Sequence, residues 1–165
     1  MSTLGKQTPR HESGLRFQRI LVAVDGSEGS TRASEVAVDL AEKYNAQLFV
    51  LSVFRGYPEY ITMFPSIPAP SGKAFEEYEA YARKAAVEVV GRIVSIAEKK
   101  GVKAKPKTNE TIGSVVQTIN DYAVAEKIDL IVMGTRGMGG FKKMLLGSVS
   151  SGVVTHAQCT VLVVR

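Results

Sequence analysis

The segment Ile128-Asp-Leu-Ile-Val-Met-Gly-Thr-Arg-Gly137, followed after nine residues by Gly147-Ser148, decides how this chain is organised. Its apolar first half predicts a strand buried on both faces, as in a parallel sheet. A helical pattern begins at Ser148 and ends at His156. Glycines let a turn bring its backbone close to an anion, and the free N–H groups of a helix start attract that charge. The segment therefore predicts a phosphate-binding turn between a buried strand and a helix.

The charges of this glycine-rich turn agree with an anionic ligand. It contains Arg136, Lys142 and Lys143, and no carboxylate lies between Gly134 and Gly147. Two simpler interpretations stay open. In the first, the glycines serve only to form a turn. In the second, the lysines only face solvent.

Strand and helix patterns alternate along the rest of the chain. Apolar runs predict strands at residues 20–24, 47–53, 127–133 and 160–164, with a weaker, proline-containing edge strand at 102–108. Helical spacing predicts a helix that starts near Ser27 or Ser30 and further helices at residues 73–100, 111–126 and 148–156. This alternation is typical of an α/β fold with an open, five-stranded parallel sheet and helices on both faces.

The predicted strand order is 3-2-1-4-5, which makes the first and fourth strands neighbours where the order reverses. Asp25, Val53 and Gly134 each stand at or just after the end of a strand. Because open parallel sheets bind ligands beyond their carboxyl ends at such a reversal, these three residues are expected in one crevice.

Two predicted helices have apolar stripes that should face the sheet. The stripe of the helix at 73–100 consists of Tyr78, Ala82, Ala85, Val89, Ile93 and Ile96. The stripe of the helix at 111–126 consists of Ile112, Val115, Val116, Ile119 and Ala123.

Residues 1–15 and 55–72 have a different composition. The first segment is polar and is predicted to be a disordered leader, which leaves one domain at residues 16–165. The second contains four prolines with tyrosine and phenylalanine between them and predicts no regular element. It is either a covering flap or partner contact, or an insertion that packs its aromatic residues on its own surface.

Composition excludes several classes of protein. The 165 residues are 45% hydrophobic with a net charge of +5, and no apolar run approaches a membrane span of about 20 residues. The basic residues are spread out and accompany no nucleic-acid motif, so neither a membrane nor a nucleic acid is an expected partner. A single cysteine agrees with a cytoplasmic location.

Familiar catalytic motifs are also missing from the sequence. There is no Gly-x-x-x-x-Gly-Lys-Ser/Thr loop, no Gly-x-Gly-x-x-Gly after the first strand and no Gly-x-Ser-x-Gly elbow. No His, Cys or carboxylate cluster has metal-binding spacing, and His156 has no nucleophile partner. No catalytic residue is therefore predicted.

The glycine motif resembles that of the universal stress proteins, and specifically their ATP-binding branch. Gly134, Gly137, Gly147 and Ser148 match that family's spacing of Gly, two residues, Gly, nine residues, Gly and Ser or Thr. The opening at residues 20–27 and the closing at 156–164 also resemble the two ends of that family's domain. One departure lies at residues 109–113, where the family often has a glycine–proline entry to a helix.

The resemblance implies an adenine-nucleotide α-hydrolase-like fold and an ATP site. In that family, an aspartate matching Asp25 contacts the ribose, and backbone groups at the position of Val53 meet adenine. Asp25 could instead only cap the next helix. The implied triphosphate loop consists of Gly134, Thr135, Arg136, Gly137, Met138, Gly139, Gly140, Gly147, Ser148 and Val149.

The function implied is that of a nucleotide-dependent regulatory module in the stress response, acting through an unidentified signalling partner. ATP would bind with Mg²⁺ or Mn²⁺, and hydrolysis should be slow because no general base is assigned. The alternative is a slow ATPase or nucleotidyl transferase of a related fold. A homodimer is also implied, and the short apolar strand at residues 161–164 is the expected contact if it lies at the sheet edge.

Overall fold

The structure is a computed structural model that describes residues 17–57, 66, 72–137 and 146–165. The predicted leader lies outside the described residues, as do most of the segment at 55–72 and the middle of the glycine-rich turn. No helix in the described ranges combines the length and the apolar composition needed to cross a bilayer.

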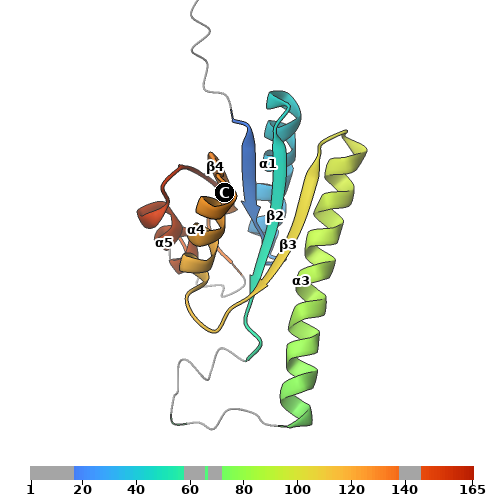
Figure 1. The fold of residues 1–165 in the computed structure, drawn as a ribbon, viewed down its shortest axis with the longest axis vertical. Helices are drawn as coiled ribbons and strands as arrows, with labels where there is room; N and C mark the ends of the chain where they lie inside the picture. Colours follow the sequence, from blue (N-terminus) through green and yellow to red (C-terminus); the bar gives the residue numbers. More distant parts are fainter. Residues whose placement is uncertain (1–16, 58–65, 67–71, 138–145) are drawn as a thin grey trace, which may run out of the picture.

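Five parallel strands form one sheet in the order β3-β2-β1-β4-β5, which confirms the predicted fold and strand order (Figure 1). Along the chain the elements are β1 (Arg19–Ala23), α1 (Glu28–Tyr44), β2 (Gln47–Phe54), α3 (Lys73–Lys99), β3 (Ala104–Glu110), α4 (Val115–Ala125), β4 (Leu130–Gly134), α5 (Ser148–His156) and β5 (Thr160–Val164). The order reverses between β1 and β4, as expected.

Helices cover both faces of this sheet and create two hydrophobic cores. Alternate strand residues point to opposite faces, so Val22 and Val50 pack with α1 and α3, whereas Leu21 and Leu51 pack with α4 and α5. All five residues of β4 are buried. This double burial explains why the central strands are continuously apolar in sequence.

On the α4 side of the sheet, charged side chains cover the amino-terminal ends of β1 and β3. Glu126 accepts hydrogen bonds from Lys105 at 2.7 Å and from Arg19 at 3.0 Å. Both cations also lie over the Phe49 ring, with Arg19 Cζ at 4.6 Å from its centroid and Lys105 Nζ at 5.3 Å. The hydrogen bond from Lys105 is the main cause that lowers the pKa of Glu126 below its usual value.

The helix starts follow capping chemistry. The Ser27 hydroxyl accepts a hydrogen bond from the Ser30 N–H at 3.2 Å, so Ser27 rather than Ser30 caps α1. Ser114 caps α4 by accepting from the Gln117 N–H. The prediction that this helix begins at residue 111 was therefore wrong, and Ile112, which was expected to be buried, is 85% exposed.

The predicted stripe of α3 was also wrong in part. The buried residues of α3 are Ala86, Val90, Ile93 and Ala97, and Ile96 is 43% exposed. Two alanines face the sheet because small side chains let the helix axis approach it closely. Because the prediction gave more weight to large apolar residues than to alanine, it placed the buried face of α3 too far toward the side that is exposed to solvent.

This corrected face predicts different costs for two identical truncations. Ile93 is 7% exposed, so Ile93→Ala should lower the free energy of unfolding by about 2–4 kcal/mol through loss of buried area and a cavity. The matched change Ile96→Ala should cost about 0.5 kcal/mol or less. Urea denaturation measures both, and equal costs would contradict the assigned face.

Candidate functional site

The carboxyl ends of β2, β1 and β4 meet where the strand order reverses. Ala23 pairs with Leu51 on one side and with Met133 on the other. Asp25, Val53 and Thr135 each follow two residues later, so they continue the same row beyond the regular pairing. The topology thus brings together three predicted site residues from distant parts of the sequence.

Gly134 allows the first turn of α1 to lie directly against the end of β4. A Cβ atom at Gly134 would stand 2.7 Å from the Gly29 carbonyl carbon and 2.8 Å from its oxygen. A Cβ at Gly29 would likewise stand 3.1 Å from the Arg136 oxygen. Main chain therefore packs against main chain, and no larger residue fits at Gly134 without displacing α1.

Asp25 lies between the start of α1 and the glycine-rich turn. Its Oδ1 accepts a hydrogen bond from the Ser27 N–H at 3.0 Å. Its Oδ2 faces Gly137, where a Cβ would stand 2.5 Å away. Because the N-cap of α1 is Ser27, Asp25 is not the capping residue, and its second oxygen is directed at the turn.

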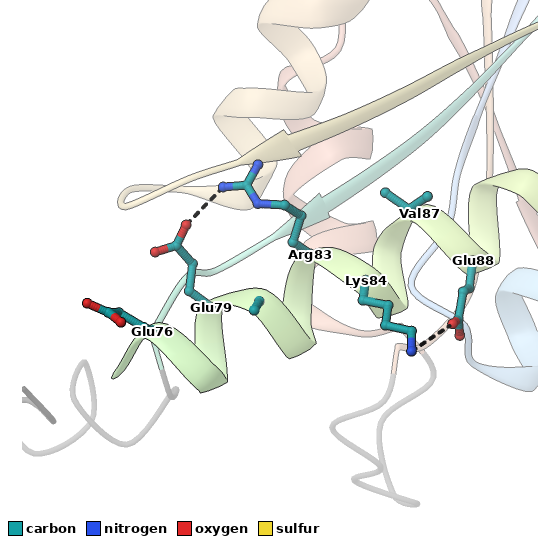
Figure 2. A pocket seen from close by; sticks show the side chains of 7 residues that line it. Glu76, Glu79, Arg83, Lys84, Val87 and Glu88 are labelled. Carbon is teal, nitrogen blue, oxygen red and sulfur yellow. Dashed lines mark hydrogen bonds and ion pairs between the residues drawn. The ribbon is translucent and has the colours of Figure 1, made fainter. Parts of the chain in front are cut away.

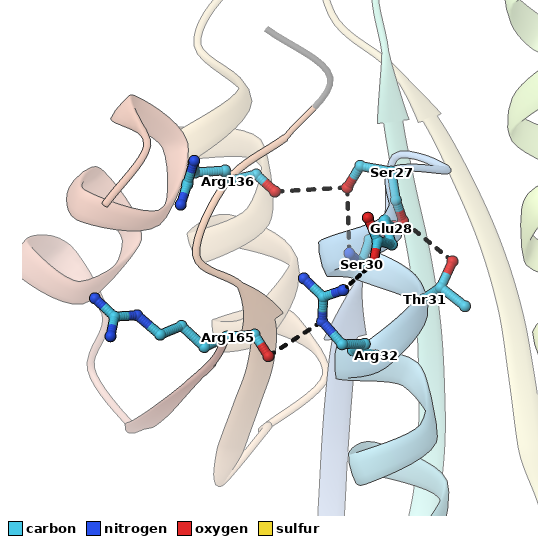
Figure 3. Close-up of polar contacts among 7 residues, drawn as sticks. All are labelled: Ser27, Glu28, Ser30, Thr31, Arg32, Arg136 and Arg165. Atoms are coloured by element: carbon cyan, nitrogen blue, oxygen red, sulfur yellow. Dashed lines mark hydrogen bonds and ion pairs between the residues drawn. The ribbon is translucent and has the colours of Figure 1, made fainter. Parts of the chain in front are cut away.

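Figure 3 shows how the turn is joined to α1 on this side. The Ser27 hydroxyl, which caps α1, also donates to the Arg136 carbonyl at 3.5 Å. The Arg136 side chain is exposed and extends away from α1. Arg32 of α1 donates to the Arg165 carbonyl at 3.1 Å, which ties the same helix to the end of β5.

The start of α5 is positioned by hydrogen bonds from the end of β4. The Gly147 N–H donates to the Thr135 carbonyl at 2.7 Å, and the Thr135 N–H donates to the Val164 carbonyl at 2.9 Å. The buried Ser150 hydroxyl donates to the Gly134 carbonyl at 2.8 Å. These bonds hold the first turn of α5 beside Gly134.

The two helices that begin at this crevice differ in charge. The start of α1 has the Ser27 cap and Glu28 in its first turn. The start of α5 has neither a side-chain cap nor an acidic residue in its first turn. Since an uncapped helix N-terminus attracts anions, the electrostatics favour a negative ligand at Ser148 and Val149 rather than at α1.

The main chain of Val53 is directed toward β1 at the level where β1 has ended. Alternate residues of a parallel strand bond to opposite neighbours. The Phe54 carbonyl accepts from the N–H of Thr111, just beyond β3, and the Leu51 carbonyl accepts from the Val24 N–H, both at 2.9 Å. Val53 therefore points its N–H and C=O into the crevice, where no main-chain partner meets them among the described residues.

Three of the predicted site residues, Met138, Gly139 and Gly140, lie outside the described residues, as do Lys142 and Lys143. The other predicted site residues lie at the carboxyl ends of β1, β2 and β4, in the turn after β4 and at the start of α5. Within the described ranges, no group of three or more His, Cys, Asp or Glu residues is close enough to hold a metal ion.

Two surface hollows lie on the α1 and α3 side of the sheet. One, of about 420 Å³, follows α3 and is lined by Glu79, Arg83 and Val87 among others (Figure 2). Arg83 is already paired with Glu79 at 2.9 Å and with Glu110 at 2.7 Å. The other is a narrow groove between α1 and α3. Both are on the face opposite α4 and α5.

Sequence reasoning missed two residues that shape the crevice, Gly29 and Ser150. Gly29 stands in the first turn of a helix, where glycine is unfavourable, and this cost is the signal that a close main-chain approach is needed there. Ser150 resembles any surface serine in sequence, so its buried bond to Gly134 has no signature.

An open parallel sheet whose strand order reverses beside a glycine-rich turn is the layout of a doubly wound α/β domain, the class in which ligands bind beyond the carboxyl ends of the strands. The sequence matches the profile of the universal stress protein family over residues 16–165, and the chain belongs to this family. It is 34% identical to the universal stress protein YxiE of Bacillus subtilis over 149 residues, which cover 90% of this chain and 99% of the relative.

Solved structures have the same adenine-nucleotide α-hydrolase-like fold. The universal stress protein UspA of Lactobacillus plantarum is 27% identical to this chain with a TM-score of 0.76. The match covers 92% of this chain and 100% of that one. A universal stress protein of Archaeoglobus fulgidus, solved in complex with dAMP, has a TM-score of 0.62 at 19% identity, covering 92% and 100% of the two chains. A further universal stress protein structure, solved in complex with cAMP, has a TM-score of 0.61 at 22% identity, and the match covers 92% of this chain and 98% of that one.

The packing of Gly134 generates a direct test. Gly134→Ala should destabilise the fold by about 2 kcal/mol or more because its methyl group meets the main chain of Gly29. Gly91→Ala is the matched control, since a Cβ at this helical position meets nothing within 4 Å. It should stabilise by about 0.5–1 kcal/mol. Thermal or urea unfolding that gave the two variants the same stability would contradict the close approach.

Proposed function

We propose that this chain binds ATP at the crevice between β1, β4 and α5 and acts as a nucleotide-dependent regulatory module. The observation that carries the proposal is the uncapped start of α5, held beside Gly134 and Gly137 without an acidic residue in its first turn. The adenine nucleotides bound by two structural relatives agree with a ligand of this kind.

The crevice offers a chemically suitable group for each part of ATP. The main-chain N–H and C=O of Val53 can hydrogen-bond the adenine edge, and Asp25 can accept from a ribose hydroxyl. The phosphates would bind the glycine-rich turn and the first amides of α5. That phosphate-binding set is Gly134, Thr135, Arg136, Gly137, Met138, Gly139, Gly140, Gly147, Ser148 and Val149.

A divalent cation would accompany the triphosphate. Mg²⁺ keeps several waters and is usually held by substrate phosphates with one or two protein oxygens. The Ser148 hydroxyl is the candidate protein oxygen, because Ser148 is exposed at the start of α5. The cation would neutralise phosphate charge, while the protein's own residues bind and orient the nucleotide.

A regulatory role fits this site better than rapid turnover. Catalysis of hydrolysis needs a group positioned to orient or deprotonate water. Asp25 is committed on one side to the Ser27 N–H, and its other oxygen faces Gly137 rather than an open space. The bound nucleotide would then be a signal for a protein partner. The proposal includes a cytoplasmic location, where nucleoside triphosphates are abundant, and one domain at residues 16–165.

Homodimer formation through β5 is part of the proposal. The two edges of the sheet differ. The β3 edge has Pro106, which lacks an N–H, and exposed lysines that oppose strand addition. The β5 edge has no charge within Thr160–Val164, and Leu162 is 36% exposed. A second copy can pair along this uncharged edge.

The ATP site can be tested with a charge placed where phosphate would bind. Saturating ATP, at 100 times its Kd, should stabilise the wild type by about 2.7 kcal/mol and raise its Tm by about 5–10 °C. Ser148→Asp should abolish this shift while leaving the ligand-free protein as stable or slightly more so, because an acidic residue suits a helix start. Gln158→Glu, an equal charge change beyond the other end of α5, should keep the ATP shift.

Two results would count against this assignment. If millimolar ATP leaves the Tm of the wild type unchanged, the chain does not bind ATP and the proposed site is rejected. Multiple turnover of ATP by the wild type that is lost in Ser148→Asp would replace the regulatory role with that of an ATPase or nucleotidyl transferase.

The proposed interface gives a separate prediction. Leu162→Lys should raise the monomer fraction in sedimentation velocity, since two lysines would meet where the edges pair. Val87→Lys, on α3 and 53% exposed, adds the same charge away from β5 and should leave the distribution unchanged. An unaltered dimer in Leu162→Lys rejects the β5 interface.

A further inference from the structure

Asn109 ends a row of side chains that crosses the carboxyl edge of the sheet. The pairing of β2 with β3 places Asn109 beside Val53. Lys105, on the same strand, lies over the Phe49 ring, which shows that these alternate positions of β3 face the α4 side. Asn109 therefore shares a face with Val53, and the row continues through Asp25 to Thr135.

The order of chemical groups along this row matches the order of groups in an adenine nucleotide. An amide at Asn109 is followed by the apolar Val53, the carboxylate of Asp25 and the phosphate-binding turn on β4. Neighbouring strands are about 4.8 Å apart, so the row from β3 to β4 spans about 14 Å. The N1 and N6 edge of adenine is the end of the base farthest from the ribose. With the ribose at Asp25, this edge points toward β3.

The Asn109 side chain is available for a ligand. It is half-buried, and within the described part of the chain its amide makes no hydrogen bond. Its strand neighbour Glu110 points to the other face and is paired with Arg83 at 2.7 Å. A half-buried amide with an unused donor and an unused acceptor is suited to a partner that presents both.

We propose that Asn109 is a specificity-determining residue that reads the outer edge of adenine, an inference that rests on the nucleotide binding proposed above. Its Oδ1 accepts from the N6 amino group, and its Nδ2 donates to N1. Adenine N1 accepts only one hydrogen bond, so Val53 serves the other side of the amino group: its C=O accepts the second N6 hydrogen. A residue of β3, which lies outside the glycine motif, thus helps to select adenine over other bases.

The test uses a change that alters hydrogen-bonding capacity at constant size. Asn109→Asp removes the donor to adenine N1 and creates an acceptor that suits the N1–H and N2 amino group of guanine. In calorimetric titrations with ATP and GTP, the preference for ATP should fall by about tenfold or more. Asn109→Leu, which lacks both groups, should weaken ATP binding by about tenfold without improving GTP binding.

Lys107→Gln is the matched control for charge. It changes the net charge by the same amount on the same face of β3, at the level of Leu51 rather than at the crevice. It should leave the ratio of the ATP and GTP dissociation constants unchanged. Circular dichroism and Tm establish that each variant is folded.

The outcomes separate this inference from the proposed function. If the wild type binds ATP and both Asn109 variants keep its ATP to GTP ratio, the role of Asn109 is overturned and the nucleotide site stands. If Lys107→Gln shifts the ratio as much as Asn109→Asp, general charge explains the effect and the role is likewise overturned. If the wild type binds no adenine nucleotide, both proposals fail.

Discussion

The contact between Gly134 and Gly29 is the constraint on which the rest of this structure depends. It lets the end of β4 and the first turn of α1 touch through their main chains, with no side chain between them. Because β4 lies so close, the turn after it passes over Asp25, and the start of α5 is held by the Thr135 carbonyl and the Ser150 hydroxyl. The crevice is thus a consequence of backbone packing.

Electrostatic asymmetry then distinguishes the two helix starts that this packing brings together. The start of α1 is neutralised by its own Ser27 and Glu28, whereas α5 begins without a cap or an acid. An anion therefore gains more at α5. The ordering of suitable groups across the strand ends, from Asn109 through Asp25 to α5, is what turns a general anion site into a candidate nucleotide site.

Sequence patterns predicted the topology well because double burial makes β1, β2 and β4 continuously apolar, and because capping residues and glycines mark element ends. They also brought Asp25, Val53 and Gly134 to one edge. They failed where small or polar residues do the packing. Alanines of α3 pack against the sheet, and Ser114 caps α4 later than the apolar pattern suggested. Gly29 and Ser150 contact Gly134 from two different helices, and the role proposed for Asn109 depends on strand register, so periodicity alone reveals none of the three.

Amide chemical shifts in NMR spectra recorded with ATP and with adenosine reveal whether main-chain N–H groups at the end of β4 and the start of α5 bind phosphate. We expect ATP, but not adenosine, to shift the amides of Gly137, Ser148 and Val149 most strongly, and both ligands to shift the amide of Val53. Shifts confined to the hollow along α3 or to the groove between α1 and α3 would contradict it.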